Sequence, residues 1–124
     1  MNSYLIMAGC LSVVVAVIHS ALGEVLIFSK LRKGKIVPTL APSPLQARNI
    51  RILWATWHVA SFFGAGFAAV FFWLATQPIE LDTVLQLVLA LPMAASSALV
   101  LWATKGRHPG WIGLGAVAVL VFLA

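Results

Sequence analysis

The sequence predicts an all-α membrane protein, with four transmembrane helices in an up-down bundle and both termini on the non-cytoplasmic side. Hydrophobic residues make up 62% of the chain and charged residues only 9%, whereas charged residues are about 25% of soluble domains. The mean hydropathy is +1.04. Each crossing needs about 20 apolar residues, so the 124 residues fit four spans in a single transmembrane domain, 1–124.

The first predicted helix covers about residues 4–29 and ends at a run of basic residues, which cannot enter hydrocarbon easily. No basic side chain precedes it, whereas a secretory signal peptide has a positive region before its apolar stretch. We therefore expect a retained anchor. The connection 30–47 contains three prolines and should run irregularly along the membrane surface.

The remaining helices are predicted at about 48–76, 81–104 and 109–124. A short acidic connection makes the second and third helices an antiparallel hairpin, and Pro92 should kink the third. The basic loop 105–108 precedes the last helix, whose 16 residues rise about 24 Å, less than a hydrocarbon core of about 30 Å. We expect the end of this helix to lie shallow or to be shielded by its neighbours.

All eight basic residues fall on one side of this arrangement, which the positive-inside rule places in the cytoplasm. They are Lys30, Arg32, Lys33, Lys35, Arg48, Arg51, Lys105 and Arg107. Apart from Arg51, we expect each of them to contact anionic lipid headgroups. The net charge of +5 is therefore a topology signal, and we expect no nucleic-acid partner. The tryptophans near this boundary, Trp54, Trp57, Trp102 and Trp111, are predicted interfacial anchors.

Four polar residues form a predicted intramembrane site that faces the cytoplasm: His19, Glu24, Arg51 and His58. His19 lies 11 residues before Lys30 and His58 lies 10 residues after Arg48, so their depths are similar at about 16 and 15 Å. If the second helix enters at Arg51 instead, the depths differ by about 5 Å. Glu24 and Arg51 are expected to pair near the boundary. The alternative is structural, with both histidines hydrogen-bonded between helices and the ion pair acting as a tie.

Small residues recur every fourth position on the first helix, at Ala8, Ser12, Ala16 and Ser20, and similar stripes occupy 60–68 and 90–98. Lipid gives no hydrophobic drive for helix association, so small side chains that allow close approach favour a compact bundle. They equally favour a homo-oligomer or a subunit of a membrane complex.

Three functional hypotheses follow. The first is a non-catalytic accessory, assembly or lipid-contacting bundle. The second is a small oligomeric proton-coupled transporter or ion channel using Glu24 and His19, because helix-borne carboxylates and imidazoles form proton relays. The third is a b-type haem or metal ion on His19 and His58, although the small stripe beside His19 predicts helices too close for a macrocycle. Motifs of nucleophilic, phosphate-binding and zinc enzymes are absent from the sequence, so we expect no enzyme.

Three strings carry a resemblance: HSALGE at 19–24, RILWATWH at 51–58 and KGRHPGW at 105–111. With them the chain resembles a group of small uncharacterised bacterial four-helix inner-membrane proteins. The resemblance covers most of the chain. It implies four helices and a multi-pass position in the bacterial cytoplasmic membrane, and it implies no activity.

Overall fold

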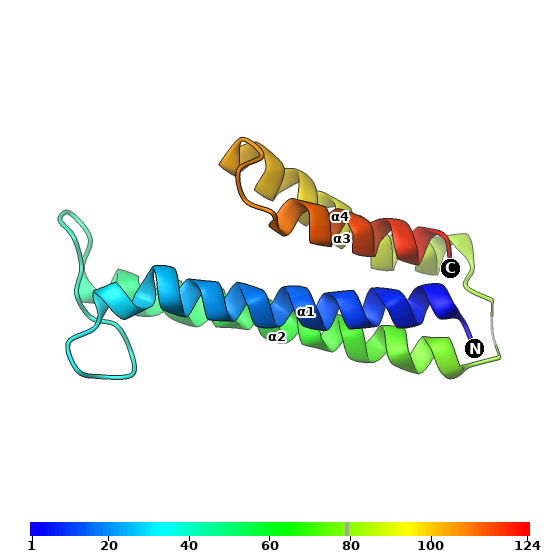
Figure 1. Cartoon of the computed structure of the whole chain (residues 1–124), viewed down its shortest axis with the longest axis horizontal. Coiled ribbons are helices and arrows are strands. Elements are labelled where there is room, and N and C mark those ends of the chain that lie inside the picture. The colour runs from blue at the N-terminus through cyan, green and yellow to red at the C-terminus, as the bar shows by residue number, and fades with distance from the viewer. Residues whose placement is uncertain (79) are drawn as a thin grey trace. The chain divides into compact units, whose positions relative to one another are not determined.

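The computed structural model describes residues 1–78 and 80–124, and within them the chain is all-helical (Figure 1). Its α-helices are α1 (Ser3–Leu26), α2 (Ala47–Thr76), α3 (Thr83–Thr104) and α4 (Gly110–Phe122), with a short 3-10 helix, η1 (Phe28–Leu31), after α1. The predicted all-α class with four helices is confirmed. The predicted bounds lie close to these, except that α1 ends earlier than expected and η1 follows it.

Three of the helices are long and apolar enough to cross a membrane: α1, α2 and α3, with 24, 30 and 22 residues. The fourth, α4, is an apolar helix of 13 residues, or about 20 Å at the helical rise. Large apolar side chains on these helices are exposed, such as Phe62 at 75% and Trp102 at 80%. Exposure of this kind is the pattern of a surface that lipid or another protein covers.

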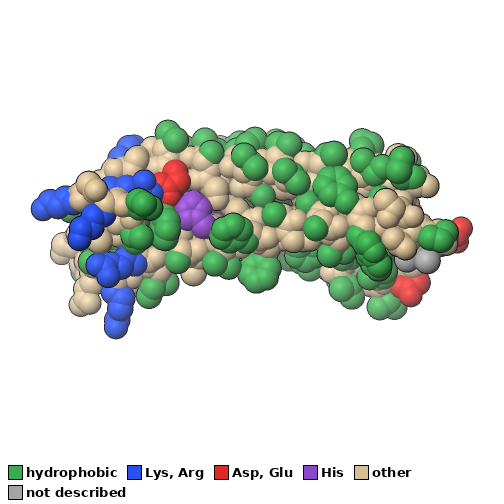
Figure 2. Space-filling model, turned by 90° about the horizontal axis from the view of Figure 1, so that it is seen from below, with side chains coloured by type: hydrophobic (Ala, Val, Ile, Leu, Met, Phe, Trp, Pro, Cys, Tyr) green, Lys and Arg blue, Asp and Glu red, His purple; other side chains and the backbone are tan. Residues whose placement is uncertain are grey.

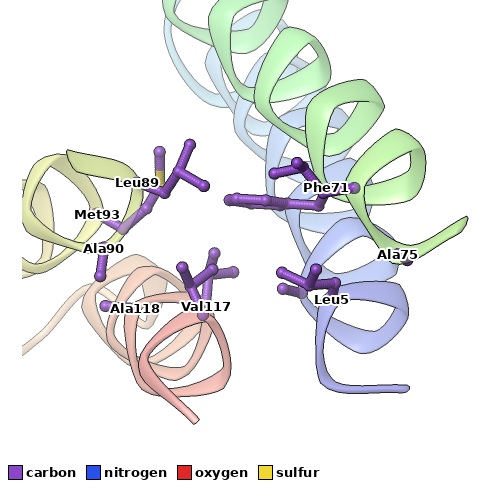
Figure 3. Packing of buried hydrophobic residues seen from close by; sticks show 11 residues of the cluster. Leu5, Phe71, Ala75, Leu89, Ala90, Met93, Val117 and Ala118 are labelled. Carbon is purple, nitrogen blue, oxygen red and sulfur yellow. The ribbon is translucent and has the colours of Figure 1, made fainter. Parts of the chain in front are cut away.

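The chain divides into two compact units, and unit 1 consists of residues 1–15 and 64–124. All four helices contribute side chains to its core, which contains Leu5, Ala8, Phe71, Leu74, Ala75, Leu89, Ala90, Met93, Val117, Ala118 and Val121. Figure 3 shows the ring of Phe71 pointing from α2 toward Leu89 of α3, while Leu5 and Val117 point toward each other. Phe71 is fully buried, so this aromatic ring is the largest element of the core.

Local hydrogen bonds fix the ends of α3 within unit 1. The Asp82 carboxylate accepts from the Leu85 N–H at 2.7 Å and caps the first turn. At the other end Lys105 is left-handed (φ 51°), and the N–H of Gly106 donates to the Leu101 carbonyl at 2.9 Å. The helix continues through Pro92. The Ser97 hydroxyl donates to the Trp111 carbonyl at 2.6 Å and joins α3 to α4.

Unit 2 consists of residues 16–63, which are the end of α1, η1, the loop after it and the start of α2. The loop folds back on η1, because the N–H groups of Thr39 and Leu40 both donate to the Leu31 carbonyl, at 3.0 and 2.9 Å. Figure 2 shows Lys and Arg side chains gathered at this loop end of unit 2, with an acidic and a histidine side chain close to them. This end of unit 2 is the place where the candidate site lies.

Candidate functional site

The polar contacts of unit 2 converge on the carboxylate of Glu24, in the last turns of α1. Its Oε1 accepts from the Trp54 indole N–H at 2.6 Å and lies 2.9 Å from His58 Nε2. Its Oε2 accepts from the Arg32 guanidinium. The side chains of Glu24, Arg32 and His58 are 28%, 27% and 20% exposed. A single carboxylate thus connects α1, α2 and the start of the loop.

A chain of hydroxyl groups extends these contacts along the two helices. Ser20 Oγ lies 2.9 Å from His58 Nδ1 and 2.8 Å from Ser61 Oγ. Ser20 is one helical turn before Glu24, and Trp54, His58 and Ser61 follow one another at spacings of four and three. Such spacings place side chains on one face of a helix. These polar side chains of α1 therefore lie on one face and those of α2 on another, and these two faces contact each other.

We call these six residues the Glu24 network: Ser20, Glu24, Arg32, Trp54, His58 and Ser61. Among the residues that the sequence predicted for the site, the network brings together Glu24 and His58. The other two, His19 and Arg51, lie elsewhere in unit 2.

His19 contacts Trp57 instead of the carboxylate. The two rings stack with centroids 4.4 Å apart and 9° between their planes, and the Trp57 indole donates to the His19 carbonyl at 2.9 Å. The Phe28 ring meets Trp57 edge-on at 5.7 Å. Gly23 leaves the room for this indole, because a Cβ at that position would overlap it. His19 therefore belongs to an aromatic contact between α1 and α2.

Arg32 takes the place that the sequence suggested for Arg51. α1 ends at Leu26, and η1 then turns the chain so that Arg32 returns to Glu24. Had the helix continued, two turns would separate these residues by about 12 Å. Arg51 is exposed on α2 and lines an open pocket of about 620 Å³. Arg32, which the sequence predicts to contact lipid headgroups, thus pairs with Glu24. The other predicted headgroup contacts are exposed: Lys30, Lys33, Lys35, Arg48, Lys105 and Arg107.

The proposed axial histidines do not fit a haem or metal ion in this arrangement. Both ring nitrogens of His58 lie within hydrogen-bonding distance of Ser20 and Glu24, so a metal ion would have to displace one of these partners, and the ring of His19 is stacked on Trp57. Across residues 1–78 and 80–124, no three His, Cys, Asp or Glu side chains lie close enough to share a metal ion.

Sequence reasoning missed four members of the network. The sequence predicts Ser20 as part of the small stripe, Trp54 as an interfacial anchor and Arg32 as a lipid contact, and it predicts no role for Ser61. The available signal was spacing: Ser20 precedes Glu24 by four residues and Ser61 follows His58 by three. Polar residues one turn from an intramembrane titratable group are natural hydrogen-bond partners for it.

Comparison with known proteins finds no matching protein family, no similar curated protein and no similar solved structure. The likeness to small bacterial inner-membrane proteins thus stays a prediction.

Proposed function

We propose that this is a multi-pass protein of the bacterial cytoplasmic membrane with a non-catalytic role as an accessory, assembly or lipid-contacting bundle. In this proposal all four helices cross the bilayer and both termini are non-cytoplasmic. The two basic connections face anionic lipid headgroups in the cytoplasmic leaflet. The protein acts as a homo-oligomer or as a subunit of a membrane complex, through the apolar surface that its helices leave exposed.

The observation that carries this proposal is the engagement of Glu24. Its two oxygens contact a guanidinium, an indole N–H and an imidazole, which come from the loop and from α2. Glu24 also lines an open pocket of about 570 Å³, but both of its oxygens are occupied, and a carboxylate held by three side chains joins the segments that supply them. The Glu24 network is therefore best explained as a tie between α1, α2 and the basic loop.

A second candidate, a proton-conducting transporter or channel, is favoured by one specific observation. Ser61, Ser20, His58 and Glu24 form a continuous chain with spacings of 2.8, 2.9 and 2.9 Å. Hydroxyl and imidazole groups both donate and accept hydrogen bonds, so a proton can pass along such a chain by successive transfers. In this candidate Glu24 exchanges protons with His58, whereas His19 is stacked on Trp57 outside the chain.

Reconstitution distinguishes the two candidates. The wild-type protein, purified in mild detergent, is placed in liposomes with a pH gradient and an internal pH dye, and the proteins that copurify with it are identified. The non-catalytic role predicts proton leakage no faster than in empty liposomes, together with stoichiometric copurifying subunits or a stable homo-oligomer.

Matched variants show whether any flux belongs to the Glu24 network. Flux in the wild type that is lost in Glu24→Gln and in Ser20→Ala, and kept in His108→Ala, would establish the relay and overturn the non-catalytic role. His108 is a suitable control because it is a histidine outside the network, whose Nδ1 accepts from the Gly110 N–H at 3.0 Å. A visible spectrum and metal analysis of the same preparation test the cofactor hypothesis directly.

A further inference from the structure

We propose that unit 2 holds one anionic phospholipid, with its phosphate between Lys35 and Arg51 and one acyl chain along the α2 face formed by Ala55, Val59 and Phe62. This inference deepens the lipid-contacting role and rests on it, since it requires the basic end of unit 2 to lie at the membrane surface. It replaces diffuse attraction to headgroups with a defined site.

The headgroup part is an open pocket of about 620 Å³ at the loop end of unit 2. Lys35 and Arg51 are the ionisable side chains in its lining, and Thr39 adds a hydroxyl group. Both cationic side chains are exposed, so their charges are available to a ligand. A guanidinium, an ammonium and a hydroxyl are the donors that bind phosphate oxygens most effectively. The charge and chemistry of this pocket therefore match an anionic phosphate ester.

The acyl-chain part is a second open pocket, of about 570 Å³, which shares Ile36 with the first. Along α2 its lining includes Ala55, Val59 and Phe62, and its other side is formed by Glu24, Arg32, Trp54 and His58 of the Glu24 network. Val59 and Phe62 are 44% and 75% exposed. Ala55, Val59 and Phe62 follow Arg51 at successive spacings of four, four and three, so they lie with it on one helix face. One face of α2 thus passes from cationic to apolar, as an amphiphilic ligand requires.

The dimensions favour a lipid over a soluble phosphate. From Arg51 to Phe62 the helix rises about 16 Å, which matches the hydrocarbon depth of one leaflet, about 15 Å. A soluble anion would use only the cationic pocket and would gain nothing from the apolar face beside it. Because both pockets are open at the surface of unit 2, a lipid can enter sideways from the bilayer.

Native mass spectrometry of the full chain in mild detergent tests the headgroup part. The probes are phosphatidylglycerol, phosphatidylethanolamine and inorganic phosphate, each titrated separately. We expect one phosphatidylglycerol per chain, with binding about tenfold weaker in Lys35→Gln/Arg51→Gln. The variant Lys105→Gln/Arg107→Gln removes the same charge from the other basic loop and should bind like the wild type. All four side chains are exposed, so the variants should fold, and thermal melting verifies this.

A pair of neighbouring phenylalanines tests the acyl-chain part. Phe62 lines the apolar pocket, whereas Phe63 is exposed to a similar degree, 69%, and lies about 100° further round the helix. Phe62→Ala should weaken phosphatidylglycerol binding several-fold, and Phe63→Ala should leave it unchanged.

Three results would overturn the lipid site: equal weakening by the two double variants, equal binding of phosphatidylethanolamine, or inorganic phosphate that competes as well as the lipid. None of these results bears on proton flux, so the lipid site can fail while the non-catalytic role stands. Conversely, a flux that depends on Glu24 would remove that role and leave selective lipid binding to be judged by its own variants.

Discussion

At the residue scale, the environment of Glu24 determines how its charge is accommodated. A carboxylate inside an apolar helix is unfavourable unless donors surround it, and here Arg32, Trp54 and His58 supply them. Because these donors come from the loop and from α2, the free energy that stabilises the charge also holds the two helices and the loop together.

Replacing Glu24 should therefore destabilise the protein. Glu24→Gln keeps the size of the side chain but removes the ion pair with Arg32, and we expect the free energy of unfolding to fall by about 1–3 kcal/mol. Thermal or denaturant unfolding in detergent measures this change. Glu80→Gln is the matched control, because Glu80 is exposed and an exposed substitution should change stability by less than about 0.5 kcal/mol. Equal effects of the two substitutions would contradict the stabilisation of the fold by the contacts of Glu24.

The hydroxyl groups of Ser20 and Ser61 should be energetically coupled, because both lie on the hydrogen-bonded chain that reaches His58. Ser20→Ala removes a partner of His58 Nδ1 and should lower the free energy of unfolding by about 1 kcal/mol. In the Ser20→Ala variant, Ser61→Ala should lower the free energy of unfolding by less than it does in the wild type. A double-mutant cycle measures this coupling, expected at about 0.5 kcal/mol or more.

Ser29 provides the comparison for that cycle. Its hydroxyl donates to the Val25 carbonyl within the same segment and is exposed, so Ser29→Ala should show no coupling to Ser61→Ala. Strict additivity of Ser20→Ala and Ser61→Ala would mean that the chain of hydroxyl groups does not act as one unit.

How far the site follows from sequence depends on the kind of residue. Glu24 and His58 were identifiable because titratable groups are rare in apolar helices, and helical periodicity places each of them on a definite face. Arg32 could not be identified in the same way, since its position depends on where α1 ends and how η1 turns. Hydropathy does not determine that end, because Ile27 and Phe28 are as apolar as the helix before them.

At the element scale, close approach between helices depends on small residues. Ala8, Ser12 and Ala16 of α1 are at most 8% exposed, as the predicted stripe required, whereas Ala94 and Ala98 of the α3 stripe are exposed. The pattern of small residues identifies surfaces capable of close contact, but it does not determine which of them a partner covers. Bounds of the long helices were more predictable, because apolar runs end at charges and prolines.

Two glycines give a matched test of that close approach. Gly23 is buried against the Trp57 indole, where a Cβ would overlap the ring, whereas a Cβ at Gly66 of α2 would meet nothing within 4 Å. Gly23→Ala should lower the free energy of unfolding by about 1–3 kcal/mol. Gly66→Ala should leave it unchanged or raise it by up to about 1 kcal/mol, because alanine favours a helix. Tryptophan fluorescence during unfolding measures both, and similar effects would contradict the contact at Gly23.

At the scale of the whole molecule, the length of α4 bears on how many times the chain crosses the bilayer. Its 13 residues give about 20 Å, short of the hydrocarbon core of about 30 Å. Within unit 1, however, α4 contributes Val117, Ala118 and Val121 to the core, and the Asn2 side chain donates to the Ala124 carbonyl at 2.8 Å. This hydrogen bond joins the end of the chain to its beginning, which favours a helix that crosses to the same side as the N-terminus.

Cysteine labelling tests whether α4 crosses the bilayer or turns back to the cytoplasmic side. Cys10 is the single cysteine, so Cys10→Ser gives a background in which Ser43→Cys, Glu80→Cys and Ala124→Cys are introduced one at a time. With a membrane-impermeant maleimide on intact spheroplasts, we expect labelling at positions 80 and 124. Position 43, in the basic loop, should react only after the membrane is permeabilised, since positive-inside orientation places that loop in the cytoplasm. Labelling of Ala124→Cys only after permeabilisation would show that α4 turns back, leaving three crossings and a cytoplasmic C-terminus.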